Sequence, residues 1–247
     1  TNKYIITLLI DKCIIYDLDL KMIQIINTGL NKHGLVSIYY NKNMCKYSLL
    51  GEKKGSIIIG NDKLFSKRVI YAHNHNINTI CYNKEGYLLA TTSTKGTLIR
   101  IFNAENNYEL IKELRRGSTF TRILNINFNE LSNFLICSNI NGSIHIFNTG
   151  INNELNHIEN KTFIYLNKIK KYIPENYLTN YIKSEWSFTK YNNNNRYILL
   201  TINNNFIYTV CDKGKFYKLE INKENGEISI VNIISFMDKH ISLFNTN

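Results

Sequence analysis

Several residue types that mark particular protein classes are scarce in this sequence. One proline and five cysteines occur among 247 residues, and no two cysteines form a C-x-x-C pair. Because zinc sites and dithiol centres use closely spaced cysteines, this spacing argues against both and favours reduced thiols. The longest apolar runs, such as 4–10, are much shorter than a bilayer requires, and no segment resembles a signal peptide. We therefore expect a cytoplasmic protein whose membrane contacts are peripheral.

Acidic residues are also few in comparison with basic ones. Lys and Arg number 30 and Asp and Glu number 19, which gives a net charge of +11. This excess favours anionic partners such as phosphates and acidic lipids. Part of the charge reflects a general abundance of Asn, Lys and Ile, seen also in the run Asn192 to Asn195. The charge therefore indicates a type of partner without identifying one.

The patterns that identify common enzymes are missing. The segment 51–56 resembles a phosphate loop but lacks the G-x-x-x-x-G-K-[ST] spacing, and His73 and His75 have no third metal ligand at a useful distance in the sequence. No paired-carboxylate motif or dinucleotide fingerprint stands out. We expect no catalytic activity, no bound metal and no other cofactor.

Internal repeats indicate the architecture. Short runs rich in Ile, Tyr, Phe and Thr alternate with Asn and Gly, which is typical of strands separated by turns. The sequence at 100–103 recurs at 145–148, and the sequence at 55–58 has a counterpart at 96–99. A period of about 40 to 45 residues is that of four-stranded propeller blades. The sequence therefore predicts an all-β fold, a β-propeller of WD-like blades that forms a single domain over 1–247.

Five blade-like units are expected along the chain, near 1–27, 28–68, 69–112, 113–190 and 191–240. The fourth is longer than the repeat, which predicts an insertion at about 150–183. Because a closed propeller needs four to eight blades with joined ends, and the first unit looks incomplete, we expect an N-terminally shortened propeller.

Specific segments resemble one family. Residues 73–93, 95–100, 113–117, 144–147 and 184–188 are similar to the PROPPIN family of WIPI-like, phosphoinositide-binding WD-repeat propellers. The resemblance implies seven blades, of which this chain supplies the third to the seventh, and two head-group sites that flank Arg115-Arg116-Gly117. The implied ligands are phosphatidylinositol 3-phosphate and phosphatidylinositol 3,5-bisphosphate. The implied role is that of a scaffold recruited to endosomal, autophagic or related membranes, with autophagy or trafficking proteins as partners.

The same resemblance implies the members of each site. The first site contains His73, Thr91, Ser93, Gly96, Thr97, Arg100 and Arg115. The second contains Arg116, Gly117, Ser138, Asn139, Ser143 and His145. Leu114 stands where the family usually has phenylalanine, and Asn139 replaces a common hydroxyl residue, which bears on the strength of the second site.

The chemistry of these residues suits phosphate. Guanidinium groups match phosphate oxygens, and the alternation of side chains along a strand predicts separate pockets for Arg115 and Arg116. We expect both arginines to be exposed, so that their removal barely affects stability. Protonation of the histidines near their ordinary pKa of about 6.5 is expected to strengthen phosphate binding. Ser93, Thr97 and Ser143 have an equally good interpretation as turn residues that bond locally.

The insertion carries an amphipathic pattern. Phe163, Leu166, Ile169 and Ile173 recur at three- and four-residue steps, with lysines between them and Pro174 at the end. This pattern predicts a short basic helix whose apolar residues enter a membrane. The alternative is a helix that packs against the side of the propeller.

Two other functions remain open. In one, the propeller is a protein-interaction scaffold whose arginines bind acidic peptides without lipid specificity. In the other, the positive charge and 17 tyrosines serve RNA binding with a steep dependence on salt. The sequence favours the lipid-binding function, and we expect no nucleic-acid partner.

Overall fold

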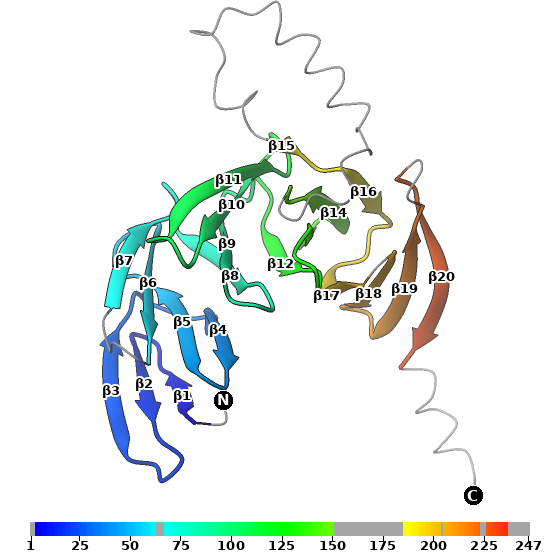
Figure 1. Cartoon of the computed structure of the whole chain (residues 1–247). Helices are drawn as coiled ribbons and strands as arrows, with labels where there is room; N and C mark the ends of the chain where they lie inside the picture. The colour runs from blue at the N-terminus through cyan, green and yellow to red at the C-terminus, as the bar shows by residue number, and fades with distance from the viewer. Residues whose placement is uncertain (1–2, 63–66, 151–184, 204, 223–225, 237–247) are drawn as a thin grey trace, which may run out of the picture. The chain divides into compact units, whose positions relative to one another are not determined.

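Strands form all the regular structure in the described part of the chain. The computed structural model describes residues 3–62, 67–150, 185–203, 205–222 and 226–236. These residues contain the strands β1 to β20 and no helix (Figure 1). The predicted all-β fold is confirmed.

The strands form five sheets in which most neighbours in sequence are neighbours in space. The first sheet contains β1 (Ile5–Leu8), β2 (Lys12–Tyr16) and β3 (Met22–Asn27). The second contains β4 (Val36–Asn41), β5 (Met44–Leu50), β6 (Ser56–Asn61) and β7 (Lys67–Tyr71). The third contains β8 (Ile77–Tyr82), β9 (Leu88–Ser93), β10 (Leu98–Asn103), β11 (Glu109–Arg115) and β15 (Glu185–Trp186).

The last two sheets have four strands each. The fourth sheet contains β12 (Ile123–Phe128), β13 (Phe134–Asn139), β14 (Ser143–Asn148) and β16 (Thr189–Asn192). The fifth contains β17 (Tyr197–Asn203), β18 (Phe206–Cys211), β19 (Lys215–Ile221) and β20 (Ile228–Ser235). β7 and β11 end at Tyr71 and Arg115, slightly beyond the expected unit boundaries at 68 and 112.

A recurring turn explains the repeats seen in the sequence. A glycine directly precedes β6, β14 and β19 (Gly55, Gly142 and Gly214), and Gly96 lies two residues before the start of β10. The φ angles of these four glycines lie between +64° and +81°. Glycine adopts such angles without the steric penalty that a Cβ causes. The same turn therefore requires the same residue once in each of these sheets.

The chain divides into two compact units. One comprises Thr1–Lys95 and Arg100–Ile111, and the other comprises Gly96–Ile99 and Lys112–Asn247. In the first unit, one apolar core surrounds Ile26 and Leu49, and another surrounds Ile57 and Leu89. In the second unit, strands of the fourth and fifth sheets share a core.

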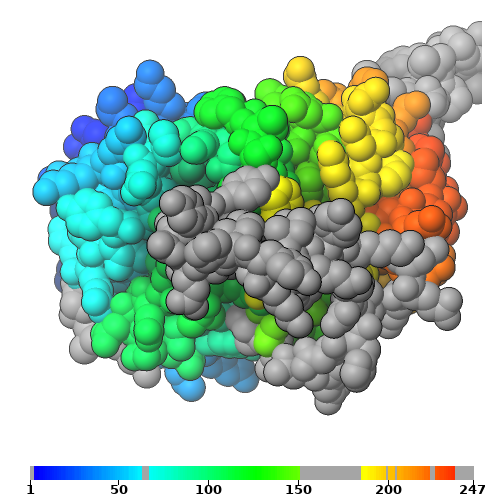
Figure 2. Space-filling view, turned by 90° about the horizontal axis from the view of Figure 1, so that it is seen from above, coloured from blue at the N-terminus to red at the C-terminus, as the bar shows by residue number. Residues whose placement is uncertain are grey.

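Within the second unit, β15 and β16 follow the segment predicted to be an insertion. β15 runs parallel to β11 at the edge of the third sheet, and β16 completes the fourth sheet beside β14. In the space-filling view these returning residues (yellow) lie beside the fourth sheet (light green) (Figure 2). The end of the insertion is thus tied to the strand that leads to Arg115 and Arg116.

Candidate functional site

Arg116 is a buried cation that directs its side chain toward backbone oxygen atoms. It is only 7% exposed, and its Nε donates to the carbonyl oxygen of Gly96 at 2.9 Å while Nη2 donates to that of Thr119. Its own backbone N–H bonds to the carbonyl oxygen of Thr97 at 2.9 Å. Burial lowers the pKa of Arg116. Within the described residues it has no acidic partner, and the two side-chain bonds use two of its five N–H donors.

His145 lies close to Arg116 and is also buried. Its pKa is lowered to about 3, first by burial and then by the positive charges of Arg116 and Lys190. Nδ1 lies 3.3 Å from Oγ of Ser187, whereas Nε2 is buried with no hydrogen-bond partner among the described residues. The imidazole is therefore neutral at physiological pH, and one of its nitrogen atoms is available to a ligand.

The register of β13 and β14 shows which predicted residues share a face with His145. Cys137 pairs with His145 directly across the two strands, so both side chains point to the same side of the sheet. Ser143, two residues before His145 on the same strand, shares that side. Ser138 pairs with Ile144 on the opposite side, and its hydroxyl donates to the carbonyl oxygen of Tyr197 at 2.7 Å. Ser138 therefore faces away from His145, and its membership of the second site stays a prediction.

Asn139 has a local structural role. Its Oδ1 accepts the backbone N–H groups of Asn141 at 3.0 Å and Ser143 at 3.2 Å, which closes the turn between β13 and β14. Short polar side chains often bond in this way. Asn139 thus orients Ser143 through the backbone, and Ser143 itself is 4% exposed.

The two glycines of the predicted sites differ in what surrounds them. A Cβ on Gly96 would lie 1.8 Å from the carbonyl oxygen of Thr121, and its φ is +64°, so the turn requires glycine. A Cβ on Gly117 would meet no atom within 4 Å. The space beside Gly117 is therefore open.

A second group of predicted residues gathers in the first unit. His73 Nε2 lies 2.9 Å from the hydroxyl of Thr91, and Arg100 Nη1 donates to the carbonyl oxygen of Ala72 at 2.7 Å. Burial, followed by the positive charge of Arg100, lowers the pKa of His73 to about 4. Ser93 lies two residues beyond Thr91 on β9 and is 5% exposed. His73, Thr91 and Arg100 are thus brought together.

The remaining predicted members of the first site belong to the second unit. Gly96 precedes β10, Thr97 is 5% exposed, and Arg115 is 8% exposed and pairs with Trp186 through the backbone. The complete first site therefore stays a prediction. The expectation that both arginines are exposed is wrong, because Arg115 is 8% and Arg116 is 7% exposed.

The expectation of histidine protonation near pH 6.5 is likewise not supported, because the pKa values of His73 and His145 are lowered to about 4 and about 3. Both His73 and His145 are more than nine-tenths buried, and burial disfavours the charged imidazole. The sequence could not show this, because the charge of a neighbouring arginine and the depth of burial depend on packing between strands.

The predicted membrane segment, with Phe163, Leu166, Ile169 and Ile173, lies outside the described residues. No helix long and apolar enough to cross a bilayer occurs in the part of the chain that is described. Ser187, at the end of the insertion, was not among the predicted site residues, although it bonds His145. In the sequence, the family resemblance of 184–188 is the signal that points to this segment.

Solved structures with this architecture define the class of protein as a β-propeller. Kluyveromyces lactis Hsv2 has a TM-score of 0.70 with 17% sequence identity, and the match covers 95% of this chain and 71% of that chain. The structure of KlAtg21 with the coiled coil of AgAtg16 has a TM-score of 0.68 with 23% identity, covering 95% and 68%. The predicted propeller class is confirmed.

Sequence comparison then identifies the family. The PROPPIN family model matches residues 3–233, so the chain belongs to the PROPPIN family. Autophagy-related protein 21 of Schizosaccharomyces pombe is 31% identical over 134 residues, covering 54% of this chain and 40% of the relative. Autophagy-related protein 18 of Eremothecium gossypii is 40% identical over 99 residues, covering 40% of this chain and 18% of the relative. The matched regions thus span less than half of these relatives.

Proposed function

We propose that this chain binds phosphatidylinositol 3-phosphate and phosphatidylinositol 3,5-bisphosphate through two sites that flank Arg115-Arg116-Gly117. PROPPIN proteins are phosphoinositide-binding propellers of a generally non-enzymatic scaffold family. The observation that carries the proposal is the buried guanidinium of Arg116, which has backbone carbonyl partners but no acidic partner in the described residues. A buried charge without a counter-charge is costly, and an anionic ligand offsets that cost.

The groups beside Arg116 suit a phosphorylated inositol. The bare Nε2 of the neutral His145 can donate or accept, and the hydroxyl of Ser143 can do both. Such groups bond phosphate oxygens and inositol hydroxyls alike, whereas a purely cationic pocket would serve phosphate alone. The open space beside Gly117 leaves room for a ring.

The relatives support a proposed biological role. The curated matches are autophagy-related proteins, and KlAtg21 was solved with a coiled coil of AgAtg16. We place this chain at endosomal, autophagic or other membranes that contain phosphatidylinositol 3-phosphate. There it acts as a recruited scaffold for autophagy or trafficking proteins.

A protein-interaction scaffold is the second candidate, because Arg116 suits a peptide carboxylate as well as a phosphate. Liposome flotation separates the two functions. Liposomes made of neutral lipid alone are compared with the same liposomes containing phosphatidylinositol 3-phosphate. Liposomes that carry the same charge from phosphatidylserine serve as the control. We expect flotation only with the 3-phosphorylated lipid.

Equal flotation with both anionic lipids would indicate attraction by net charge, and no flotation with any lipid would favour the peptide scaffold. Either result contradicts the proposed function. An RNA-binding propeller would instead retain RNA with a steep dependence on salt.

A further inference from the structure

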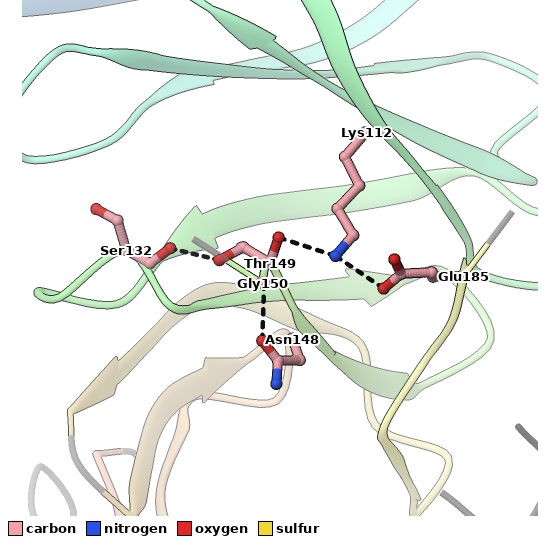
Figure 3. A network of polar contacts seen from close by, with 6 residues as sticks. All are labelled: Lys112, Ser132, Asn148, Thr149, Gly150 and Glu185. Atoms are coloured by element: carbon pink, nitrogen blue, oxygen red, sulfur yellow. Dashed lines mark hydrogen bonds and ion pairs between the residues drawn. The ribbon is translucent and has the colours of Figure 1, made fainter. Parts of the chain in front are cut away.

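One lysine bonds residues on both sides of the predicted insertion. Lys112 lies on β11, and its Nζ donates to the carbonyl oxygen of Thr149 at 2.9 Å and pairs with Oε2 of Glu185 at 2.8 Å (Figure 3). Thr149 directly follows β14, and Glu185 begins β15. The lysine side chain is 16% exposed, so these bonds form in a largely covered position. We call Lys112, Thr149 and Glu185 the Lys112 anchor.

The Thr149 side of the anchor is rigidly held. The hydroxyl of Thr149 donates to the carbonyl oxygen of Ser132 at 2.7 Å, and the backbone N–H of Gly150 donates to Asn148 Oδ1 at 2.8 Å (Figure 3). A Cβ on Gly150 would lie 2.9 Å from Lys112 Nζ, and Gly150 has a φ of +68°. The absence of a side chain at Gly150 therefore makes room for the ammonium group. Lys112 meets a carbonyl oxygen whose position the surrounding bonds fix.

The Glu185 side leads directly to the candidate site. β15 has two residues, and its register places Glu185 opposite Leu114 and Trp186 opposite Arg115. One residue further, Ser187 reaches His145 Nδ1. Residues 185–187 thus connect the strand of Arg115 with the strand of His145.

The parallel pairing of β15 with β11 is only two residues long, and parallel pairs are slightly less stable per residue than antiparallel ones. An ion pair with a partly exposed carboxylate contributes modestly, and Glu185 is 44% exposed. The lysine, however, makes two bonds at once and is itself mostly covered. The two bonds of Lys112 therefore add to the backbone pairing that holds β15 on β11.

We propose that Lys112 is a positioning residue for head-group binding. It holds residues 185–187 so that Ser187 orients His145 and Trp186 stays paired with Arg115. The anchor itself touches no ligand. This role rests on the proposed function, since it concerns the same pocket.

The test uses Trp186, which is the single tryptophan of the 247-residue chain. Its fluorescence reports directly on residues 185–187. Calorimetry with soluble inositol 1,3-bisphosphate measures ligand binding in the pocket without any membrane. In Lys112→Met we expect a red shift of the emission and an affinity about tenfold lower, equivalent to about 1.4 kcal/mol. Lys112→Arg keeps a cation with several donors and should restore most of the affinity.

Two further variants make the test independent of folding defects. Glu185→Gln removes the ion pair but leaves the bond to Thr149, so it should lower affinity less than Lys112→Met, and the double variant should resemble Lys112→Met alone. Lys213→Met, which removes the same charge from an exposed turn, should bind as the unmodified chain does.

Unchanged affinity in both Lys112→Met and Glu185→Gln would overturn the inference, even if the fluorescence shifted. Equal losses in Lys112→Met and Lys213→Met would also overturn it, because the effect would then be one of net charge. If the unmodified chain bound no head group, the proposed function would fail and the role of Lys112 would fail with it. The proposal is supported if only Lys112→Met and Glu185→Gln lose affinity for inositol 1,3-bisphosphate and Lys112→Arg retains most of it.

Discussion

At the scale of single residues, burial determines the chemistry of the cationic side chains. Arg116 is covered and bonded to backbone carbonyl oxygens, and His145 is held neutral beside it. The sequence predicted these residues through a family resemblance and predicted the alternation of faces through strand periodicity. It could not predict that Ser138 and Ser143 lie on opposite faces of one sheet, because the position of a turn sets that register.

The buried histidines give the protein a stability that depends on pH. In the unfolded chain, histidine binds a proton as the pH falls through about 6.5. In the folded chain, His73 and His145 stay neutral down to about pH 4 and about pH 3. Between these values the unfolded state binds more protons, so the free energy of unfolding decreases as the pH falls, by up to about 1.4 kcal/mol per unit for each histidine.

Urea unfolding at pH 7 and pH 5 measures this dependence. His145→Gln removes one of the two groups, so its stability should change less between these two pH values than that of the unmodified chain. His33→Gln, at an exposed position, is the control and should leave the pH dependence unchanged. An equal loss of stability on acidification in His145→Gln and the unmodified chain would show that His145 titrates normally in the folded state.

At the scale of elements, the repeated glycine turn made the fold predictable. The turns before β6, β10, β14 and β19 carry glycines at positive φ, and this requirement is visible in the sequence as a period. β15 was not predictable in the same way. It has two residues and pairs with a strand distant in the sequence, so no local pattern signals it.

Two glycines near the candidate site should respond differently to the same change. Gly96→Ala places a Cβ against the carbonyl oxygen of Thr121 at positive φ, and we expect a loss of about 2 kcal/mol or more. Gly117→Ala points into open space and should change stability by less than about 0.5 kcal/mol. Urea unfolding of both variants checks the pair, and similar losses would mean that the turn at Gly96 is not as the structure shows.

At the scale of the whole molecule, the proposed membrane binding combines head-group recognition with the predicted insertion. The described ends of the insertion meet at Lys112, on the strand that leads to Arg115 and Arg116. In this proposal, linked contacts of the insertion and the head-group sites bind more tightly than either alone. The sequence indicated both parts separately, but the meeting point depends on a lysine bond that only three dimensions reveal.

The apolar residues of the insertion are predicted to contribute only when a membrane is present. Burying one such side chain is worth roughly 1.5–3 kcal/mol, so replacing Phe163 and Ile169 together with Asp should weaken liposome binding by about a hundredfold or more. Affinity for soluble inositol 1,3-bisphosphate should stay unchanged. Asn152→Asp with Asn153→Asp adds the same charge to the same segment and serves as the control. A parallel loss of soluble ligand binding would assign the segment to the fold or the pocket.

The central claim is that Arg115 and Arg116 bind phosphoinositide head groups in two pockets. The most direct measurement is flotation on liposomes containing phosphatidylinositol 3-phosphate, comparing Arg115→Ala, Arg116→Ala and the double variant. Because the arginines are buried, circular dichroism and thermal unfolding must accompany each assay, and Arg122→Ala with Arg196→Ala serves as the charge-matched control. We predict that each single variant keeps partial binding, that the folded double variant loses binding, and that the control floats normally. Undiminished flotation of the double variant would contradict the claim.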